Sequence, residues 1–551
     1  MNIASSRHFS KLAQDFIGNF ETSPIKPFFP ISPFDQGATF LSLINTRLQE
    51  YNAVENLRET IATTIRQYHS KFSFLSKSVE DNLTKLLAPN TVAIVTGQQV
   101  GILGGPLYTI YKALHTTILA KQYSALFPQF SFVPIFWQET EDHDFDEVRS
   151  VAIPGQDSGL KHISYTPSNP IERVQIGGLK FESAAIEAFF TELRETLPKT
   201  DFSEQVFELF EQYYTPAHSF AEAQAAVLMA LLADDGLLVI NANSRDVKSF
   251  ASPVFAKEIS TCPQLSEGIE AQSVLLSEHY HAQVEAKGMN LFLSQDGKRI
   301  KLQQDGDSFK AGGEIFSKAQ LLTISETEPE RLSMNVVMRP LVQDTILPTV
   351  AYVAGPGEIA YFAQFKAAYD WAGITMPKIV PRITLTVLEE RFEKLVIKFQ
   401  TSIESLIEYD GQLVKELLTS EKELEIASHY DQASETIEQL IESLRNITEA
   451  ADASLAGALT SLKGKVLTQI KDFASKTAGA ERKKQQASKQ QFEKALSNLL
   501  PEGKLQEREL NLIYFLNKYG LELWKGLKTS LMEAPHDPKE HLILPVTTLI
   551  R

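Results

Sequence analysis

The sequence predicts an α/β protein: a doubly wound core of alternating strands and helices, followed by an antiparallel helical coiled coil. Within the first 385 residues, short apolar β-type runs are mostly separated by helical patterns. Residues 386–500 contain no proline and read as helix throughout. Glycine turns follow two of the apolar runs, as at strand ends in doubly wound sheets. The four predicted core strands are residues 92–96, 130–137, 236–241 and 349–354.

Size and composition narrow the class of protein. A chain of 551 residues with 43% hydrophobic content exceeds one ordinary core and predicts two or three domains. The net charge of -16 argues against a general nucleic-acid binder, which needs lysines and arginines against phosphate. Cys262 is the single cysteine, which excludes an internal disulfide and suits a reducing compartment, so we expect a cytoplasmic protein. No signal peptide and no membrane span is expected, because no uninterrupted apolar stretch is long enough.

The first motif, VAIVTGQQVGILGGPLYTIY at residues 92–111, is a strand, a glycine-rich loop and a helix start. Helix N-termini bind phosphates through free amides and the helix dipole, so this loop is a candidate phosphate site. Its spacing fits neither the dinucleotide G-x-G-x-x-G pattern nor the P-loop, because Pro106 follows Gly105 where the P-loop has lysine.

The second motif, FWQETEDHDFDEV, places six carboxylates and one imidazole within nine residues after a predicted strand. Ligands of open α/β sheets bind at the carboxyl ends of strands, which favours a functional role. His143 is a candidate acid–base or phosphate-contact residue, with Asp142 or Asp144 orienting it or binding a divalent cation. The alternative is an acidic surface loop, and the spacing specifies no metal.

The third motif, MRPLVQDTILPTVAYVAGPGEIAYFAQF, repeats the strand, glycine turn and helix pattern. Glu358 lies near the helix start, and taken alone it is better explained as a capping residue than as a site residue. Arg339, Gln343 and Asp344 are candidates for carboxylate or phosphate binding, with an internal Arg339–Asp344 salt bridge as the alternative. Lys112 and Arg382 carry the same two interpretations.

The predicted domains are residues 1–385, 386–500 and 501–551. Two Asp-Gly steps predict hairpins in a small β-rich unit inserted at about 265–320. Two helices with a break around 428–433 predict an antiparallel coiled coil that dimerises. After Pro501 a helix precedes LILPVTTLI, which we expect to return to the core sheet. The first helix seam is Leu385, Leu388, Phe392, Leu395, Phe399, Ile403 and Leu406, and the second is Leu455, Leu459, Leu462, Val466, Ile470 and Phe473.

The three motifs, with FETSPIKPFFP near the N-terminus and LQERELNLIYFLNKYG near the C-terminus, resemble the bacillithiol biosynthesis cysteine-adding enzymes, the BshC family. The resemblance runs from near residue 15 to near residue 520. It implies a Rossmann-like core similar to class I synthetases and nucleotidylyltransferases, with a dimerising coiled coil. It also implies a ligase that adds cysteine to the amine of glucosaminyl malate.

Amide formation in water needs an activated carboxylate, so the resemblance implies ATP or another nucleotide, with Mg²⁺ as a further candidate. An adenylate or acyl phosphate would place phosphates on the glycine loop, with Arg339 or Arg382 holding a substrate carboxylate. The sequence has no H-I-G-H motif of synthetase type. The candidate catalytic residues are His143, Asp142 and Asp144. The candidate nucleotide- and substrate-binding residues are Thr96, Gly97, Gln98, Gln99, Gly101, Gly104, Gly105, Tyr108, Lys112, Glu141, Arg339, Gln343, Asp344, Gly355, Gly357, Glu358 and Arg382.

Two other functions are compatible with the residues. One is a hydrolase of an acylated amino sugar, in which the EDHD segment binds a metal that activates water. The other is a non-catalytic scaffold that recruits a pathway enzyme through its coiled coil.

Overall fold

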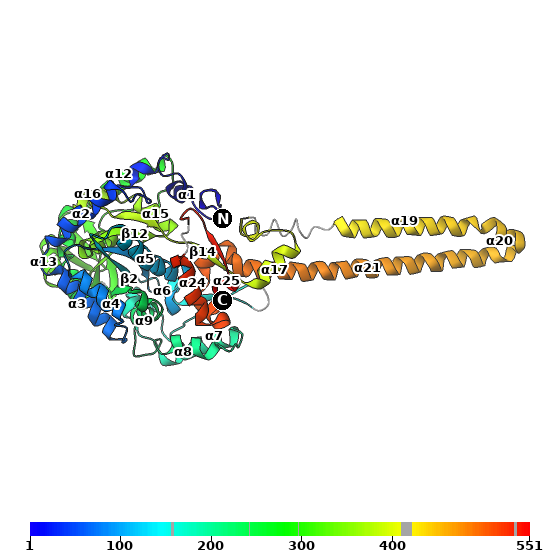
Figure 1. Ribbon diagram of the computed structural model, residues 1–551, viewed down its shortest axis with the longest axis horizontal. Coiled ribbons are helices and arrows are strands. Elements are labelled where there is room, and N and C mark those ends of the chain that lie inside the picture. The colour runs from blue at the N-terminus through cyan, green and yellow to red at the C-terminus, as the bar shows by residue number, and fades with distance from the viewer. Residues whose placement is uncertain (156–158, 242, 296, 409–420, 534–536, 551) are drawn as a thin grey trace. The chain divides into compact units, whose positions relative to one another are not determined.

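A computed structural model describes residues 1–155, 159–241, 243–295, 297–408, 421–533 and 537–550 (Figure 1). The chain forms two compact units. The first comprises Met1–Gly155, Leu160–Glu389 and Lys504–Arg551, and the second is built on Glu390–Gly503. The segment after the coiled coil therefore belongs to the same unit as the N-terminal domain.

The first unit is organised around a five-stranded parallel sheet of order β13-β12-β1-β2-β5. The four core strands expected from the sequence all belong to it, which confirms that prediction. The fifth strand, β13, was not predicted, because its four residues are too short to show a period of their own. The strands are β1 Thr91–Gln99, β2 Ser131–Glu139, β5 Leu238–Asn241, β12 Thr349–Ala354 and β13 Lys378–Pro381.

The strand order reverses between β1 and β12, as in Rossmann-like sheets. All six residues of β12 and the first seven of β1 are buried. Because successive side chains of a strand point to opposite faces, both faces of the sheet are covered. The carboxyl ends of β12, β1 and β2 meet at one edge, on either side of the switch point.

Helices connect and cover these strands (Figure 1). Helix α5 connects β1 to β2 and is buried along most of its length. The helices of this unit are α1 Lys11–Gly18, α2 Ala38–Asn52, α3 Leu57–Ser70, α4 Lys77–Leu86, α5 Leu107–Leu126, α6 Phe145–Val148, α7 Ser183–Thr196, α8 Ser203–Glu211, α9 Phe220–Leu232, α10 Arg245–Ser249, α11 Ser252–Thr261, α12 Gln264–Ser277, α13 Lys318–Thr327, α14 Met338–Ile346, α15 Pro356–Phe362, α16 Lys366–Ala372, α22 Gln506–Glu509, α23 Leu512–Tyr519, α24 Leu521–Glu533 and α25 Val546–Leu549.

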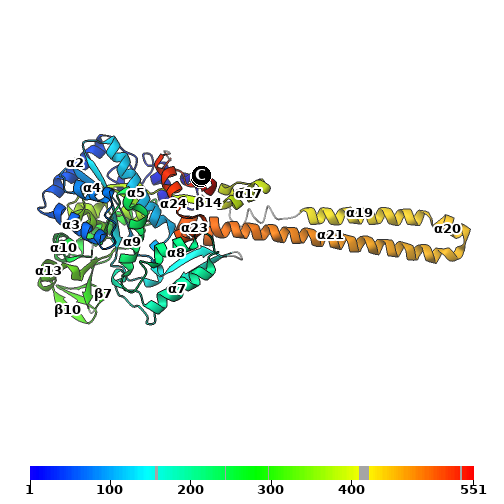
Figure 2. The same ribbon diagram turned by 60° about the horizontal axis from the view of Figure 1, so that its bottom comes forward.

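The expected β-rich insertion begins later than predicted. Residues 264–277 form helix α12, because Leu265, Ile269 and Leu276 repeat at helical spacing and are buried. Short strands follow from Leu291 and form the sheets β11-β6-β7 and β10-β9-β8. Figure 2 shows β10 close to α13. The strands are β6 Leu291–Gln295, β7 Lys298–Lys301, β8 Gln303–Asp305, β9 Ser308–Ala311, β10 Glu314–Ser317 and β11 Leu332–Met334, and a separate hairpin pairs β3 Ser150–Pro154 with β4 Leu160–Ser164.

The C-terminal tail forms a different sheet from the one expected. Strand β15, Leu542–Pro545, pairs in parallel with β14, Leu385–Leu388, in a two-stranded sheet apart from the five-stranded one. Leu385 and Leu388 therefore belong to a strand, and their assignment to a helix seam was wrong. The β-branched composition of both segments suits this pairing.

The second unit contains a helical hairpin. Helix α19, Glu421–Ser443, and helix α21, Ala456–Leu499, lie side by side and are joined through α20, Arg445–Ala451 (Figure 1). Tyr430 lies 3.0 Å from Thr477, and Lys463 lies 2.9 Å from Glu438, so the helices run antiparallel as predicted. The break predicted at 428–433 is wrong, since α19 continues through it and the turn follows Ser443. Helix α17, Glu390–Lys398, precedes the hairpin, and the residues between 408 and 421 lie outside the described part.

Candidate functional site

A cavity of about 560 Å³ opens at the carboxyl ends of β12, β1 and β2, on both sides of the switch point. Ligands of doubly wound sheets bind at this position. Five cationic side chains line it: Lys112, Arg299, Arg339, Arg382 and Arg508. Three carboxylates also line it: Glu139, Asp142 and Glu358. This excess of positive charge favours an anionic ligand.

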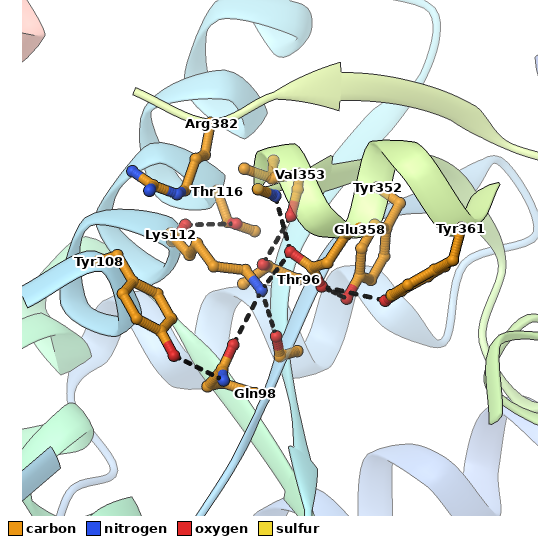
Figure 3. Close-up of polar contacts among 12 residues, drawn as sticks. Thr96, Gln98, Tyr108, Lys112, Thr116, Tyr352, Val353, Glu358, Tyr361 and Arg382 are labelled. Atoms are coloured by element: carbon orange, nitrogen blue, oxygen red, sulfur yellow. Dashed lines mark hydrogen bonds and ion pairs between the residues drawn. The ribbon is translucent and has the colours of Figure 1, made fainter. Parts of the chain in front are cut away.

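Lys112 and Glu358 form an ion pair across the switch point (Figure 3). The Nζ atom of Lys112 lies 2.7 Å from Glu358 Oε2, and it donates to Gly97 O at 2.5 Å and to Gln98 Oε1 at 3.3 Å. Burial lowers the pKa of Lys112, and the neighbouring Glu358 charge opposes that shift. Lys112 thus ties α5 to the end of β1 and to the first turn of α15.

Glu358 caps its own helix and serves the cavity as well. Its Oε2 accepts a hydrogen bond from Gly355 N at 2.7 Å, which is the capping role expected from its position. Its Oε1 accepts from Tyr352 Oη at 2.7 Å. Burial acts to raise the pKa of Glu358, but Lys112 and the hydrogen bonds outweigh burial, so its pKa lies below the usual value. Glu358 is therefore ionised at neutral pH.

Arg339 reaches the cavity from α14 and contacts two tyrosines, the buried Tyr352 and the partly buried Tyr361. Its Nη2 lies 3.1 Å from Tyr361 Oη and 3.4 Å from Tyr352 Oη, and its Nη1 donates to Gln343 Oε1 at 3.1 Å. The alternative interpretation of the sequence was a salt bridge between Arg339 and Asp344. In the structure Asp344 instead accepts a hydrogen bond from Tyr369 Oη at 2.5 Å. Gln343 links the two residues, because its Oε1 accepts from Arg339 while its Nε2 donates to Asp344 Oδ1 at 2.9 Å.

The end of β1 requires glycine at residue 97. A Cβ there would lie 3.0 Å from the Trp137 carbonyl and 3.4 Å from Arg339 Nη1. Glycine therefore lets the Arg339 guanidinium approach the strand. The next residue, Gln98, donates to Tyr108 Oη at 3.1 Å (Figure 3).

The acidic motif contributes Glu139 and Asp142 to the cavity. Burial, and then the charge of Glu141, raise the pKa of Glu139 to about 7, while Arg339 and Arg299 act in the opposite direction. Asp142 accepts a hydrogen bond from the Gln99 side chain, and its Oδ1 lies 3.8 Å from Arg299 Nη1. Glu139 can therefore gain and lose a proton near neutral pH.

The remaining residues of this motif are engaged elsewhere. Glu141 forms a buried ion pair with Lys248 of α10 and is not a cavity residue. Asp144 caps the short helix α6 by accepting from Glu147 N at 3.3 Å. His143 lies beside the cavity, where its Nδ1 is 3.1 Å from Arg299 Nη1. Since Arg299 can only donate, His143 Nδ1 is an acceptor in this contact.

Arg382 follows β13 and is held in place by Glu507. Its Nη2 donates to Glu507 Oε1 at 2.6 Å, and its Nη1 donates to Ile383 O at 3.0 Å. Glu507 also accepts from Thr384 Oγ1 at 2.9 Å and from Leu385 N at 3.0 Å. The segment after the coiled coil therefore positions a cation of the cavity.

The glycine loop does not have the predicted arrangement. Helix α5 begins at Leu107, and Leu107 N already donates to Leu510 O at 2.9 Å. Asn511 Nδ2 donates to Gly105 O at 2.7 Å and to Leu103 O at 3.2 Å. The chain itself thus covers this helix start. Gly104 and Gly105 have positive φ angles, so glycine serves the tight turn there rather than contact with the cavity.

The cavity gathers about half of the residues expected from the sequence. Those that line it are Gly97, Gln98, Gln99, Tyr108, Lys112, Asp142, Arg339, Gly355, Gly357, Glu358 and Arg382. Those placed outside its lining are Thr96, Gly101, Gly104, Gly105, Glu141, His143, Asp144, Gln343 and Asp344. Thr96 is buried and donates to Val353 O at 2.8 Å, so it joins β1 to β12.

Several lining residues were absent from the predicted set. Glu139 is the last residue of β2, and the tendency of ligands to bind at the carboxyl ends of strands could have predicted it. Arg299 and Phe292 come from the inserted strands, where nothing in the sequence marked them, and the Arg299 guanidinium lies 3.9 Å from the centre of the Phe292 ring. Gln283, Val284, Met334, Asn335, Val336, Pro356, Tyr361 and Arg508 complete the lining.

The described residues offer neither a metal-binding cluster nor a membrane-spanning helix. No group of three or more His, Cys, Asp or Glu side chains there is arranged to hold a metal ion. No helix there combines the length and the apolar character needed to cross a membrane.

Comparison with known proteins agrees with this architecture. Residues 1–383 match the family model "Bacillithiol biosynthesis BshC, N-terminal Rossmann-like domain", and residues 385–545 match "Bacillithiol biosynthesis BshC, C-terminal coiled-coil domain".

Relatives named "Putative cysteine ligase BshC" match nearly the full chain. The one from Chlorobaculum tepidum is 35% identical over 88% of both chains. The one from Chloroherpeton thalassium is 33% identical over 91% of both, and the one from Geobacillus thermodenitrificans is 30% identical over 94% of this chain and 95% of the relative. Both family models together span almost the whole sequence, and the chain belongs to the BshC family.

Proposed function

We propose that this protein forms an amide bond between the carboxylate of cysteine and the amine of glucosaminyl malate, with ATP or another nucleotide activating the carboxylate. The observation that carries the proposal is the cavity at the switch point, which is lined by five cationic side chains and by Glu139, whose pKa burial raises to about 7. The relatives' name, cysteine ligase, supports the same reaction class.

The lining fits an anionic nucleotide together with a carboxylate substrate. The guanidinium groups of Arg339 and Arg382 carry more N–H donors than their contacts with the protein use. The cavity volume lies within the range that accommodates small-molecule ligands. A bound nucleoside triphosphate would supply the leaving group that the cysteine carboxylate lacks. Mg²⁺ needs only one or two protein carboxylates beside phosphates, and Asp142, which lines the cavity, would take that role in place of its contacts with Gln99 and Arg299.

The chain's own groups account for charge and proton transfer. The amine must lose a proton as its nitrogen bonds to the carboxyl carbon, and Glu139 is placed to accept that proton. Arg339 and Arg382 can stabilise the negative charge that develops on the carboxyl oxygen. Tyr352 and Tyr361 fix Arg339, and Glu507 fixes Arg382, so these donors are oriented before the substrates bind.

Mass spectrometry of the purified protein tests this proposal. Glucosaminyl malate, cysteine, ATP and Mg²⁺ are incubated together, and each is omitted in turn. We expect a product heavier than glucosaminyl malate by one cysteinyl residue, formed only when a nucleotide is present and consumed. Product without nucleotide would contradict the activation step. Absence of product with intact substrates would favour a scaffold, and release of an acyl group from an acylated amino sugar would favour the hydrolase.

The second unit supports a homodimer, which we include in the proposal. Its hairpin exposes large apolar side chains, including Leu440, Leu462 and Phe473 at 50–63% exposure. Exposed apolar surface of this kind is typical of an interaction face. Light scattering at micromolar concentration should therefore give about twice the 61.6 kDa mass of one chain. Replacing Leu462 and Phe473 by Glu should reduce it to one chain, whereas a wild-type monomer would contradict dimerisation.

A further inference from the structure

The segment LQERELN at residues 505–511 lies beyond the coiled coil in sequence but borders the cavity. Gln506 binds both main-chain groups of Val387: its Oε1 accepts from Val387 N at 2.8 Å, and its Nε2 donates to Val387 O at 3.1 Å. Glu507 is buried against Arg382, and the buried Asn511 holds the loop before α5. The backbone of residue 508 is therefore anchored on both sides.

Arg508 is the one residue of α22 that lines the cavity. Its side chain is exposed and close to Tyr108, whose pKa burial raises to about 12 while the charges of Arg382 and Arg508 oppose the rise. Tyr108 in turn lies 5.6 Å from the Arg382 guanidinium, measured to the centre of its ring. Arg508, Tyr108 and Arg382 thus make up one side of the cavity.

The five cations of the cavity differ in how they are engaged. Lys112 pairs with Glu358, Arg382 with Glu507, Arg339 with Gln343 and the tyrosines, and Arg299 with Ser333 and His143. Among the residues that the structure describes, the Arg508 guanidinium alone of the five has neither a hydrogen bond nor an ion pair. A planar guanidinium of this kind can bind a carboxylate through two parallel hydrogen bonds.

We propose that Arg508 forms, with Tyr108, the subsite for a carboxylate of the acceptor substrate. This proposal rests on the ligase function above, in which the acceptor carries the malyl group. The anchored segment fixes the backbone position from which the Arg508 side chain extends. The guanidinium is exposed at the cavity and is therefore accessible to an incoming ligand. The phosphates of the nucleotide present similar anionic oxygens, so the test must separate the two sources.

Calorimetric binding provides that test, because it needs no turnover. Three probes are titrated separately into the full-length protein: glucosaminyl malate, methyl glucosaminide, which lacks both carboxylates, and ATP with Mg²⁺. We expect Arg508→Gln to lower the affinity for glucosaminyl malate at least tenfold. The affinities for methyl glucosaminide and for ATP with Mg²⁺ should stay within twofold of the wild-type values. Arg508→Lys should recover part of the affinity, because lysine keeps the positive charge but cannot form the two parallel hydrogen bonds of a guanidinium.

Lys504→Gln is the matched control. Lys504 is an exposed cation directly before that segment; it pairs with Glu509 at 2.7 Å and lies outside the cavity lining. Its removal changes the net charge equally, so we expect the affinity for glucosaminyl malate to stay within twofold. An equal loss in this control would assign the effect to general electrostatics and overturn the subsite.

The remaining outcomes are also decisive. Weaker ATP binding in Arg508→Gln would show a phosphate subsite, and unchanged binding of all three probes would show no role; either result overturns the proposal. No binding of glucosaminyl malate to the wild type would also overturn it. Arg508-dependent binding without any cysteinyl product would sustain the subsite and contradict the ligase. Ligation with an unchanged KM in Arg508→Gln would contradict the subsite alone.

Discussion

Lys112→Met should lower both the stability and the activity of this protein more than any other single change in the cavity. Lys112 is 1% exposed, and its ammonium group contacts Gly97, Gln98 and Glu358. Its loss leaves Glu358 without its cation, and removing one partner of a buried pair costs about 3–5 kcal/mol. Urea denaturation measures this change in the free energy of unfolding.

The expected loss of activity follows from position rather than direct contact with substrate. Lys112 holds the end of β1 against the start of α15, so its removal displaces both sides of the switch point. Misplacement of about 1 Å costs on the order of 100-fold in rate. We therefore expect kcat to fall by about that factor, with a smaller change in KM.

A double variant separates the two effects. Lys112→Met with Glu358→Gln removes both charges and should regain much of the lost stability while activity stays low. Lys121→Met on the same helix is the matched control, because Lys121 is 53% exposed and its partner Asp235 keeps a second cation, Lys528, at 2.7 Å. An exposed pair contributes about 0–1 kcal/mol, so that variant should stay active and stable. Full activity in the double variant would contradict the role of Lys112.

The parallel sheet could be predicted because its strands are buried on both faces. Residues 92–96 and 349–354 read as uninterrupted apolar runs, and glycine turns follow them. The position of the hairpin turn could not be predicted in the same way. Leu440 and Phe473 are exposed, so the regular spacing of apolar residues in this unit does not mark the residues that pack in one continuous core.

The candidate site was predictable where its residues come directly after core strands. Gln98 lies at the carboxyl end of β1, and Asp142 and Glu358 follow β2 and β12, so topology alone brings them together. Arg299 and Arg508 come from the insertion and from beyond the coiled coil, and only the tertiary structure places them there. The glycine loop was misleading because the amide at the start of α5 is occupied by Leu510, more than 400 residues later.

Glu139→Gln should remove a group that titrates near neutral pH. Burial, with the neighbouring Glu141 charge, raises the pKa of Glu139 to about 7. If the ionised carboxylate accepts the amine proton, kcat in the wild type rises with pH through an apparent pKa near 7. The amide of Gln cannot accept that proton, so the rising limb should vanish and kcat should fall about 10²–10⁴-fold.

The same substitution should increase stability at alkaline pH, because it removes a charge that the folded state disfavours. The pKa of Glu139 is higher in the folded state than in the unfolded state. Its contribution to folding is therefore complete below the unfolded value and is lost as pH rises through the folded value. At pH 8.5 the wild type carries a charge at the partly buried Glu139 that costs up to about 3 kcal/mol, because each pKa unit corresponds to about 1.4 kcal/mol.

Urea denaturation at two pH values measures this difference. We expect Glu139→Gln to match the wild type near pH 4 and to exceed it at pH 8.5. Glu147→Gln is a suitable comparison, since Glu147 lies in the same acidic motif but outside the cavity lining. Burial also raises the pKa of Glu147, so a stability gain at high pH can occur there, while kcat should keep its rising limb. A rising limb that persists in Glu139→Gln would assign the titration to the substrate amine and exclude Glu139 as the base.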